Sequence, residues 1–429
     1  MTTSTLPQGT RVLATMLDNG PEFITLDEAA AAAGVVHLPL PLFFTPAQVA
    51  HALQAAGADT MITADGVKRL PFAPVPLPPG TAKITFTSGT TGAPKGVCLT
   101  AGAMDAVADG LIAAMAPLGI TRHLNALPFA VLLENIAGLL APRRHGVHVI
   151  TLPLREVGLI GSSQFDPARL HAAVVAHAAE SLILLPQMLR SWVAWLAATR
   201  QRAPASLKLV AVGGAAVGAP LVEAAWALGI PACEGYGLSE GASVQTLNLP
   251  GTQRAGSVGR ALPHAQLRVN AHGEIEVAGS LFAGYLGSAE AVPVWWPTGD
   301  LGHIDADGDV WIRGRRKHVL ITAYGRNVSP EWVETALRSQ PAVAQAVVFG
   351  DGQPALSAVL WPTRDHADLQ AAVDAANATL PDYARIARWT PGRATFDASA
   401  GLATTNGRPQ RAAIAALHAD ALFADPQTA

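Results

Sequence analysis

Hydrophobic residues recur along most of the chain at two spacings, one typical of helices and one of strands. Helical spacing occurs in four segments, at residues 26–33, 46–56, 168–178 and 221–228. Apolar or alternating runs between these segments predict buried strands at residues 35–40, 182–185 and 207–212. Helices that alternate with short buried strands predict a layered α/β architecture up to about residue 310.

The pattern changes from about residue 256, where short strands and turns replace the longer helices. The short strands are predicted at residues 267–269, 274–277 and 310–312. After residue 327 helix and strand patterns resume, with helices at 330–338 and 367–380 and strands at 343–349 and 357–361. These last elements are enough for a small α+β domain that follows the larger α/β region.

Composition narrows the class of protein. The chain has 429 residues, of which 50% are apolar and 14% charged, so it can form a large core in two or three domains. The net charge of −3 gives no electrostatic reason to expect nucleic acid or an anionic membrane as a partner. Two cysteines, Cys98 and Cys233, do not make a disulfide framework and are typical of a reducing compartment.

The sequence also indicates whether the protein is exported or inserted into a membrane. The N-terminus lacks the apolar core of a signal peptide, and the apolar run at residues 130–140 is interrupted by Glu134. No uncharged apolar run reaches the roughly 18 residues that a membrane span requires. We therefore expect a soluble, cytoplasmic protein without a membrane span.

Candidate chemistry begins at residues 87–96, TSGTTGAPKG, which combine four hydroxyls, three glycines and Lys95. This is not a Walker-type phosphate loop, because Lys95 follows proline and a glycine stands where that motif has serine or threonine. Strand patterns at 83–87 and 96–100 predict a hairpin, and a helix at 104–115 can start only after the N-cap Thr100. The loop can hold phosphate through backbone N–H groups, hydroxyls and one ammonium, although a solvated turn has the same composition.

A second segment, EGYGLSE at residues 234–240, offers groups suited to a nucleotide. Its two glycines would let the backbone come close to a ligand, and Tyr236 presents an aromatic face to a planar base. Ser239 and Glu240 supply oxygens suited to phosphate and Mg²⁺. Alone, the segment fits an ordinary turn equally well.

Two more segments extend this set. In WPTGDLG, residues 296–302, the carboxylate of Asp300 can accept hydrogen bonds from both hydroxyls of a ribose. The basic segment GRRKH at 314–318 is followed by YGRNV at 324–328. Each one alone equally fits a capping aspartate or a solvated charge run, but all four segments in this order favour a nucleotide site.

With these segments the chain resembles the adenylate-forming superfamily, which groups acyl-CoA synthetases, nonribosomal-peptide adenylation domains and luciferases. The resemblance covers about residues 12–414, and the sequences of the segments EGYGLSE and GRNVSPEWVE are most similar to those of medium- and long-chain acyl-CoA synthetases. It implies a large layered α/β N-terminal domain, residues 1–316, and a small mobile α+β C-terminal domain, residues 317–429. The site would lie between them, with a hinge at about residue 317.

The resemblance implies a ligase with two half-reactions. ATP, with Mg²⁺, and a small-molecule carboxylic acid would give an acyl-adenylate and pyrophosphate. A thiol of coenzyme A or of a phosphopantetheinyl acyl carrier protein would then displace AMP. Two alternatives stay open: a ligase that passes the acyl group to an amine or another nucleophile, and a degenerate relative that binds nucleotide or acyl ligand without turnover.

The resemblance also implies residue roles around ATP. The residues that it places there are Thr87, Ser88, Gly89, Thr90, Thr91, Gly92, Lys95, Gly213, Gly214, Ala215, Glu234, Gly235, Tyr236, Gly237, Ser239, Asp300 and Arg315. Among them Tyr236 would stack on adenine, Asp300 would hold the ribose, and Ser239 would meet the α-phosphate.

Further roles follow from the same resemblance. Glu240 would bind the metal, Lys317 would lie at the hinge, and Gly325 would border the thiol tunnel. The acyl group would be bordered by Phe129, Gly214 and Gly237. The catalytic set would be Lys95, Ser239, Glu240 and Arg408.

Two departures from the family pattern stand out. The phosphate loop comes at residue 87, markedly earlier than in relatives, so we expect either a thinner face of the large domain or a second subunit, as in a homodimer, that covers it. Arg408 in TNGRPQR stands where relatives carry the lysine that bridges carboxylate and α-phosphate. Arginine keeps the charge but is planar and larger, so either the first half-reaction is slow or the acid is unusual.

The segment LPFAVLLEN, residues 127–135, indicates which kind of acid the protein activates. Relatives that activate amino acids place an aspartate there for the α-ammonium, and this chain has none. An apolar acyl or aryl tail is therefore expected. Glu134 is interpreted as a structural partner rather than an ammonium clamp, because an unpaired buried charge is costly.

Overall fold

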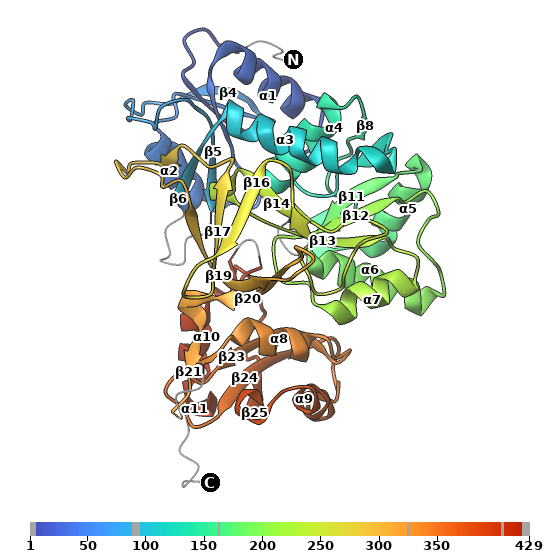
Figure 1. Ribbon diagram of the computed structural model, residues 1–429. Helices are drawn as coiled ribbons and strands as arrows, with labels where there is room; N and C mark the ends of the chain where they lie inside the picture. The colour runs from blue at the N-terminus through green and yellow to red at the C-terminus, as the bar shows by residue number, and fades with distance from the viewer. Residues whose placement is uncertain (1–5, 88–94, 162–163, 324–326, 405–406, 423–429) are drawn as a thin grey trace.

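The computed structural model of the protein describes residues 6–87, 95–161, 164–323, 327–404 and 407–422. Figure 1 shows a large N-terminal body and a smaller C-terminal body that meet near β19 (Trp296–Ile304) and β20 (Val310–Arg315). The smaller body contains the elements from α8 (Pro330–Arg338) onward. This is the predicted mixed α/β fold with a large and a small domain.

One seven-stranded sheet carries the N-terminal part of the chain, with strand order β18-β6-β5-β2-β1-β3-β4. Its strands are β1 (Val12–Met16), β2 (Val36–Pro39), β3 (Thr60–Thr63), β4 (Gly66–Arg69), β5 (Thr81–Thr87), β6 (Lys95–Thr100) and β18 (Gly284–Tyr285). Strand β1 pairs parallel with β2 and β3, whereas β5 and β6 pair antiparallel. The predicted hairpin is thus confirmed.

Helix boundaries in this region follow local capping. Helix α2 (Pro46–Ala56) has its predicted bounds because Thr45 and Gln48 form a reciprocal capping box at its start. Helix α3 (Ala101–Met115) begins after Thr100, whose hydroxyl accepts from the N–H of Ala103. Helix α1 (Pro21–Ala33) begins before the predicted residue 26, since a proline in the first turn has no N–H that needs a partner.

A second seven-stranded sheet forms the rest of the large domain, in the order β15-β14-β13-β12-β11-β7-β8. Its strands are β7 (Arg122–Leu124), β8 (His148–Ile150), β11 (Ser181–Leu184), β12 (Leu209–Val212), β13 (Ala232–Leu238), β14 (Ser243–Leu247) and β15 (Arg260–Ala261). Strands β7, β11, β12 and β13 are parallel neighbours. Parallel strands of this kind are normally covered by helices on both faces.

Helices cover both faces of the second sheet. One face packs on α5 (Pro167–His177), α6 (Pro186–Thr199) and α7 (Ala219–Ala227) around the fully buried Trp192. The other face lies toward α3, the π-helix η2 (Glu134–Leu140) and α4 (Ala141–Arg144). The sequence predictions included neither α6 nor β14, although the buried Met188, Leu189, Trp192 and Leu196 of α6 recur at helical spacing.

A four-stranded antiparallel sheet leads to the small domain. Its order is β16-β17-β19-β20, with β16 (Ala265–Val269) and β17 (Glu274–Gly279). In the small domain a three-stranded sheet is formed by β23 (Val343–Phe349), β24 (Leu356–Pro362) and β25 (Ile386–Pro391). The helices are α8, α9 (Leu369–Ala378), α10 (Arg411–Leu417) and α11 (Ala419–Leu422).

The small domain has hydrophobic clusters of its own, made of residues from Val328 onward. Its α8 touches the large domain, where the guanidinium of Arg190 on α6 donates to the carbonyl oxygen of Arg338. This contact holds the small domain against one end of the second sheet, and Arg316, just before the small domain, pairs with Glu274 of β17 at 3.0 Å.

One described segment, residues 101–118, is long and apolar enough to cross a membrane by length and composition alone. It consists of α3 and a short 3₁₀ turn, and it includes two aspartates, Asp105 and Asp109. Both carboxylates pair with Arg144 of α4. Its inner side packs beside η2 and β14 in the hydrophobic core, as expected of a helix that covers a sheet.

Candidate active site

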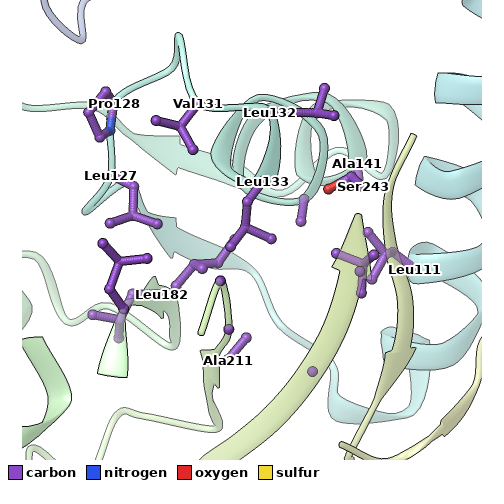
Figure 2. A pocket seen from close by; sticks show the side chains of 18 of the residues that line it. Leu111, Leu127, Pro128, Val131, Leu132, Leu133, Ala141, Leu182, Ala211 and Ser243 are labelled. Carbon is purple, nitrogen blue, oxygen red and sulfur yellow. The ribbon is translucent and has the colours of Figure 1, made fainter. Parts of the chain in front are cut away.

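A cavity of about 280 Å³ lies between the second sheet and the α3–η2 layer. Figure 2 shows its apolar lining, with Leu133 before η2 and Ala211 of β12 on opposite sides and Leu111 of α3 farther along. At the end nearest the small domain, the lining changes to Gly213, Gly214, Tyr236, Ser239 and Arg408. The apolar space and the predicted nucleotide residues are thus parts of one continuous cavity.

Strand ends place the nucleotide residues at this point. Gly213 and Gly214 directly follow β12, and the EGYGLSE segment forms the end of the neighbouring parallel strand β13. Carboxyl ends of parallel strands are the usual place for ligand sites in α/β sheets. Position 237 also requires glycine for a structural reason, because a Cβ there would lie 2.0 Å from the carbonyl oxygen of Ser243 on β14.

Asp300 is the centre of a short hydrogen-bonded chain. Its side chain lies on β19 and is 4% exposed. Its carboxylate accepts from the hydroxyl of Tyr236 at 2.6 Å and faces Nε of Arg315 at 2.6 Å. Burial raises the pKa of Asp300, and Arg315 and Tyr236 oppose that shift. The structure therefore brings together three predicted residues from three strands.

Cations outnumber carboxylates around this point. Burial and the neighbouring charges of Arg315, Arg408 and Lys95 lower the pKa of Lys317. Burial and Arg315 lower the pKa of Arg408, against which Asp300 and Glu240 act. These four cations lie near Asp300 and Glu240, while Glu331, whose charge also acts on Asp300, pairs with His318 and Arg411, and this arrangement favours a ligand that brings negative charge.

Glu240 lies in the 3₁₀ turn η3 (Ser239–Gly241) that follows β13. Its Oε1 accepts from the hydroxyl of Tyr285 at 2.7 Å, and the ammonium of Lys95 lies 5.3 Å from the centre of the same tyrosine ring. Tyr285 is on β18, which pairs with the hairpin strand β6. Tyr285 was not predicted from the sequence, because a lone tyrosine in an apolar run carries no chemical signal.

Part of the predicted phosphate loop cannot be placed in this geometry. Ser88, Gly89, Thr90, Thr91 and Gly92 lie outside the described residues, as does Gly325. Thr87 and Lys95, which bracket the loop, are register partners at the ends of β5 and β6. The loop therefore joins two antiparallel strands, unlike a Walker-type loop between a strand and a helix.

Two predicted site residues lie elsewhere. Phe129 does not line the cavity: it is 1% exposed and packs on Phe23 with ring centres 5.3 Å apart. The carboxylate of Glu234 accepts from the backbone N–H of Gly256 at 2.8 Å, and burial raises its pKa to about 7. Phe129 is thus separated from the cavity that the acyl group was expected to occupy, and the carboxylate of Glu234 is bound by a neighbouring loop.

Two further residues from the sequence analysis, Ala215 and Glu134, also lie outside the cavity lining. Ala215 is exposed and is not part of the cavity lining. Glu134 is fully buried behind the cavity and accepts from the side-chain amide of Asn125 at 2.8 Å, and burial raises its pKa to about 8. This position agrees with the interpretation of Glu134 as a structural partner.

Sequence comparisons identify related families. Residues 71–286 match the family model described as AMP-binding enzyme, and residues 317–422 match that of the AMP-binding enzyme C-terminal domain. The chain is 38% identical over 154 residues to the long-chain-fatty-acid–CoA ligase FadD15 of Mycobacterium bovis, which is 34% of this chain and 26% of that protein. It is 31% identical over 296 residues to the 2-succinylbenzoate–CoA ligase of Bacillus velezensis, 64% of this chain and 56% of that protein.

Solved structures have the same fold. The o-succinylbenzoate CoA synthetase MenE from Bacillus subtilis, in complex with the acyl-adenylate intermediate OSB-AMP, superposes with a TM-score of 0.77 at 23% identity, covering 94% of this chain and 87% of that one. ATP-bound MatB from Rhodopseudomonas palustris gives a TM-score of 0.77 at 23% identity, covering 96% and 90%. The chain spans about a quarter of the length of FadD15 and just over half of the length of the 2-succinylbenzoate–CoA ligase. Because the first family model covers half of the chain and the second covers the small domain, the protein belongs to the AMP-binding enzyme family.

Proposed function

We propose that the protein is an AMP-forming acid–thiol ligase that activates a carboxylic acid with an apolar tail. The observation that carries this proposal is the cavity itself, whose apolar length ends among Tyr236, Ser239 and Arg408. An acid in this cavity would place its tail against leucines and its carboxylate among the cations. The CoA ligase names of FadD15 and of the 2-succinylbenzoate relative support the same reaction class.

The nucleotide would lie across the ends of β12 and β13. Tyr236 would offer its ring to adenine and Asp300 its carboxylate to the ribose, while Ser239 and Lys95 would approach the phosphates. Asp300 is held in place for this task by Tyr236 and Arg315. Preorganised charged acceptors of this kind bind more strongly than neutral ones.

Mg²⁺ would be held by Glu240 together with phosphate oxygens. Within the described ranges, no three His, Cys, Asp or Glu side chains cluster so that they could hold a metal by themselves. One carboxylate with substrate phosphates is a common arrangement for Mg²⁺, and Glu240, next in sequence to the cavity-lining Ser239 and hydrogen bonded to Tyr285, fits it. The bound ion would offset phosphate charge.

In the first half-reaction a carboxylate oxygen of the acid would attack the α-phosphorus of ATP. The bond between that phosphorus and the bridging oxygen to the β-phosphate breaks, and pyrophosphate leaves. The carboxylate and the α-phosphate both carry negative charge, so a cation between them lowers the barrier. Arg408 is the cavity-lining cation contributed by the small domain, and we assign it this role.

In the second half-reaction a thiol sulfur of coenzyme A, or of a carrier protein, would attack the acyl carbon. The carbon–oxygen bond to AMP breaks, and a thioester and AMP are released. Arg408 would have to withdraw so that the thiol can approach. We place the hinge for this movement at Lys317, in the 3₁₀ turn η4 (Arg316–His318) that directly follows β20.

The decisive experiment is a screen for acid-dependent AMP formation over a panel of carboxylic acids, with and without coenzyme A. We expect pyrophosphate and an acyl-adenylate with apolar acids alone, and AMP together with a thioester when coenzyme A is present. Acid-dependent pyrophosphate release without thioester in the presence of coenzyme A would indicate a different acceptor, such as a carrier protein or an amine. If no acid gives pyrophosphate or AMP while ATP still binds, the chain is a nucleotide-binding relative without turnover, and the proposed function is refuted.

A further inference from the structure

The part of the cavity away from the small domain is apolar except for a few buried polar side chains. One of them is His123 on β7, which lines the cavity and is 5% exposed. Its ring Nδ1 lies 2.8 Å from the hydroxyl oxygen of Ser181. The two residues are register partners on the adjacent parallel strands β7 and β11, so the imidazole ring is fixed in orientation by the sheet.

The other ring nitrogen of His123 is unused. Nε2 has no hydrogen-bond partner among the described residues. Burial lowers the pKa of His123 to about 4, so the ring is neutral near pH 7. Buried polar atoms without a partner are rare in proteins, and each one calls for an explanation.

The distance between the two ends of the cavity can be estimated from the sheet. Ser181 pairs with Leu209, and Gly213 follows four residues later along β12. The separation is about 13 Å along the strand and about 10 Å across two strands from β12 to β7, or about 16 Å in total. An extended chain covers about 3.8 Å in three bonds, so about twelve bonds would connect these points.

The polar group at this end would be uncharged. Arg408 is the ionised side chain of the cavity lining, and it lies at the opposite end. His145 also lines the cavity, but it lies at an exposed position after α4. A carboxylate or an ammonium beside neutral His123 would be buried without a partner, which is strongly unfavourable.

We propose that the preferred acid carries a neutral hydrogen-bonding group, such as a hydroxyl, near the end of a long apolar tail, and that His123 Nε2 binds this group. The proposal rests on the proposed function, because it assumes that the acid occupies this cavity. Ser181 acts as a positioning residue that holds the ring. The class of substrate is a straight or extended acid of about ten to fourteen carbons with a polar terminus.

The test uses two acids matched in length, one ending in a hydroxyl and one in a methyl group. Their affinities for wild-type protein and for His123→Leu are measured by calorimetry, and their kcat/KM values by AMP release. We expect the ratio of hydroxyl-ended to methyl-ended affinity to fall by about 10-fold or more in His123→Leu, since a buried polar group left unpaired penalises the wrong ligand.

Two variants serve as controls. Ser243→Ala removes another unpaired hydroxyl from the same cavity, on β14 beside Ala141 (Figure 2). His171→Leu makes the same substitution at an unpaired histidine of α5 that does not line the cavity. Both should keep the wild-type ratio, and all variants should unfold near the wild-type temperature.

The outcomes separate this inference from the proposed function. An unchanged ratio in His123→Leu overturns the inference and shows that water satisfies Nε2. A ratio that falls equally in Ser243→Ala overturns it as well. AMP release from both acids without discrimination refutes only the His123 assignment, whereas discrimination in binding without AMP release supports the assignment and refutes only the ligase reaction.

Discussion

Two charged regions of the large domain differ in how their charges are balanced. The first is a buried network that links Lys83 of β5 to Asp27 of α1 at 2.8 Å and to the side chain of Asn135 in η2. Asp27 also faces Nδ1 of His37 at 2.5 Å, and Nε2 of His37 lies 2.8 Å from the hydroxyl of Thr15. The cation, the carboxylate and the imidazole are all paired within the protein.

The second region is the cavity end, where Lys95, Arg315, Lys317 and Arg408 face Asp300 and Glu240. Here like charges lie close enough to lower the pKa of Lys317 and of Arg408, with burial as the larger cause. In the buried network, the charges near Asp27 are of opposite sign. Burial by itself would raise the pKa of Asp27, but Lys83 and His37 together hold it well below the usual range.

The difference shows how structural and functional charges can be distinguished in this molecule. A network that satisfies its own charges stabilises the fold and needs no ligand. A cluster with excess positive charge is unfavourable alone and becomes favourable when phosphate and carboxylate groups enter. Substitutions in the two regions should therefore affect different measurements, stability in one and adenylate formation in the other.

The largest effect is expected from Lys83→Met. This change leaves the carboxylate of Asp27 buried without its cation, so the free energy of unfolding should fall by about 3–5 kcal/mol. Denaturant unfolding measures it. The matched control is Lys208→Met, whose pair with Glu180 at 3.2 Å is at the surface and should contribute less than about 1 kcal/mol.

This prediction has a pH signature with a definite sign. The pKa of Asp27 is depressed in the folded protein, so its contribution is present above the unfolded carboxyl pKa of about 4 and is lost as the pH falls below that value. The stability difference between wild type and Lys83→Met should therefore shrink toward acid pH. A difference that is constant from neutral to acid pH, or that is as small as in Lys208→Met, would contradict a structural role for the network.

Arg408→Ala should have the largest effect on chemistry with little effect on stability. Loss of one well-placed charge-stabilising donor slows reactions by about 10²–10³-fold, and adenylate formation should slow by that factor. Thioester formation from preformed acyl-adenylate should be nearly unchanged. Arg393→Ala is the matched control, because Arg393 pairs with Asp420 on the outer side of the small domain.

Arg408→Lys sharpens this test. The variant should retain much of the rate if only the charge matters, and lose it if the site needs a planar guanidinium. Wild-type adenylation rates in Arg408→Ala would mean that another cation bridges the carboxylate and the α-phosphate.

Tyr285→Phe should have the smallest effect. The variant removes the hydroxyl that donates to Glu240 at 2.7 Å but keeps the ring beside Lys95. Loss of such an outer partner weakens metal binding by about 10-fold, so the Mg²⁺ concentration for half-maximal AMP formation should rise by that factor. Calorimetry of ATP with and without Mg²⁺ separates this effect from ATP binding itself, and Tyr383→Phe on the small domain is the control.

Much of the local structure was predictable from the sequence alone. Helices at 46–56 and 330–338 have their predicted bounds, and the β5–β6 hairpin and the N-cap Thr100 are as expected. Capping boxes, prolines at helix starts and strand periods act between residues a few positions apart, so a short segment contains the relevant interactions. The ordered motifs likewise indicated the family from residue types and order.

The tertiary structure decided which way side chains face and what they meet. Phe129 was expected at the acyl group but packs on Phe23, more than a hundred residues earlier in the chain. Lys83 finds its partner 56 residues away in Asp27, and Tyr285 meets Glu240 across 45 residues. His123 lines the cavity because β7 pairs with β11 in one particular register. These contacts depend on which strands become neighbours, and that is set by packing of the whole domain rather than by any local pattern.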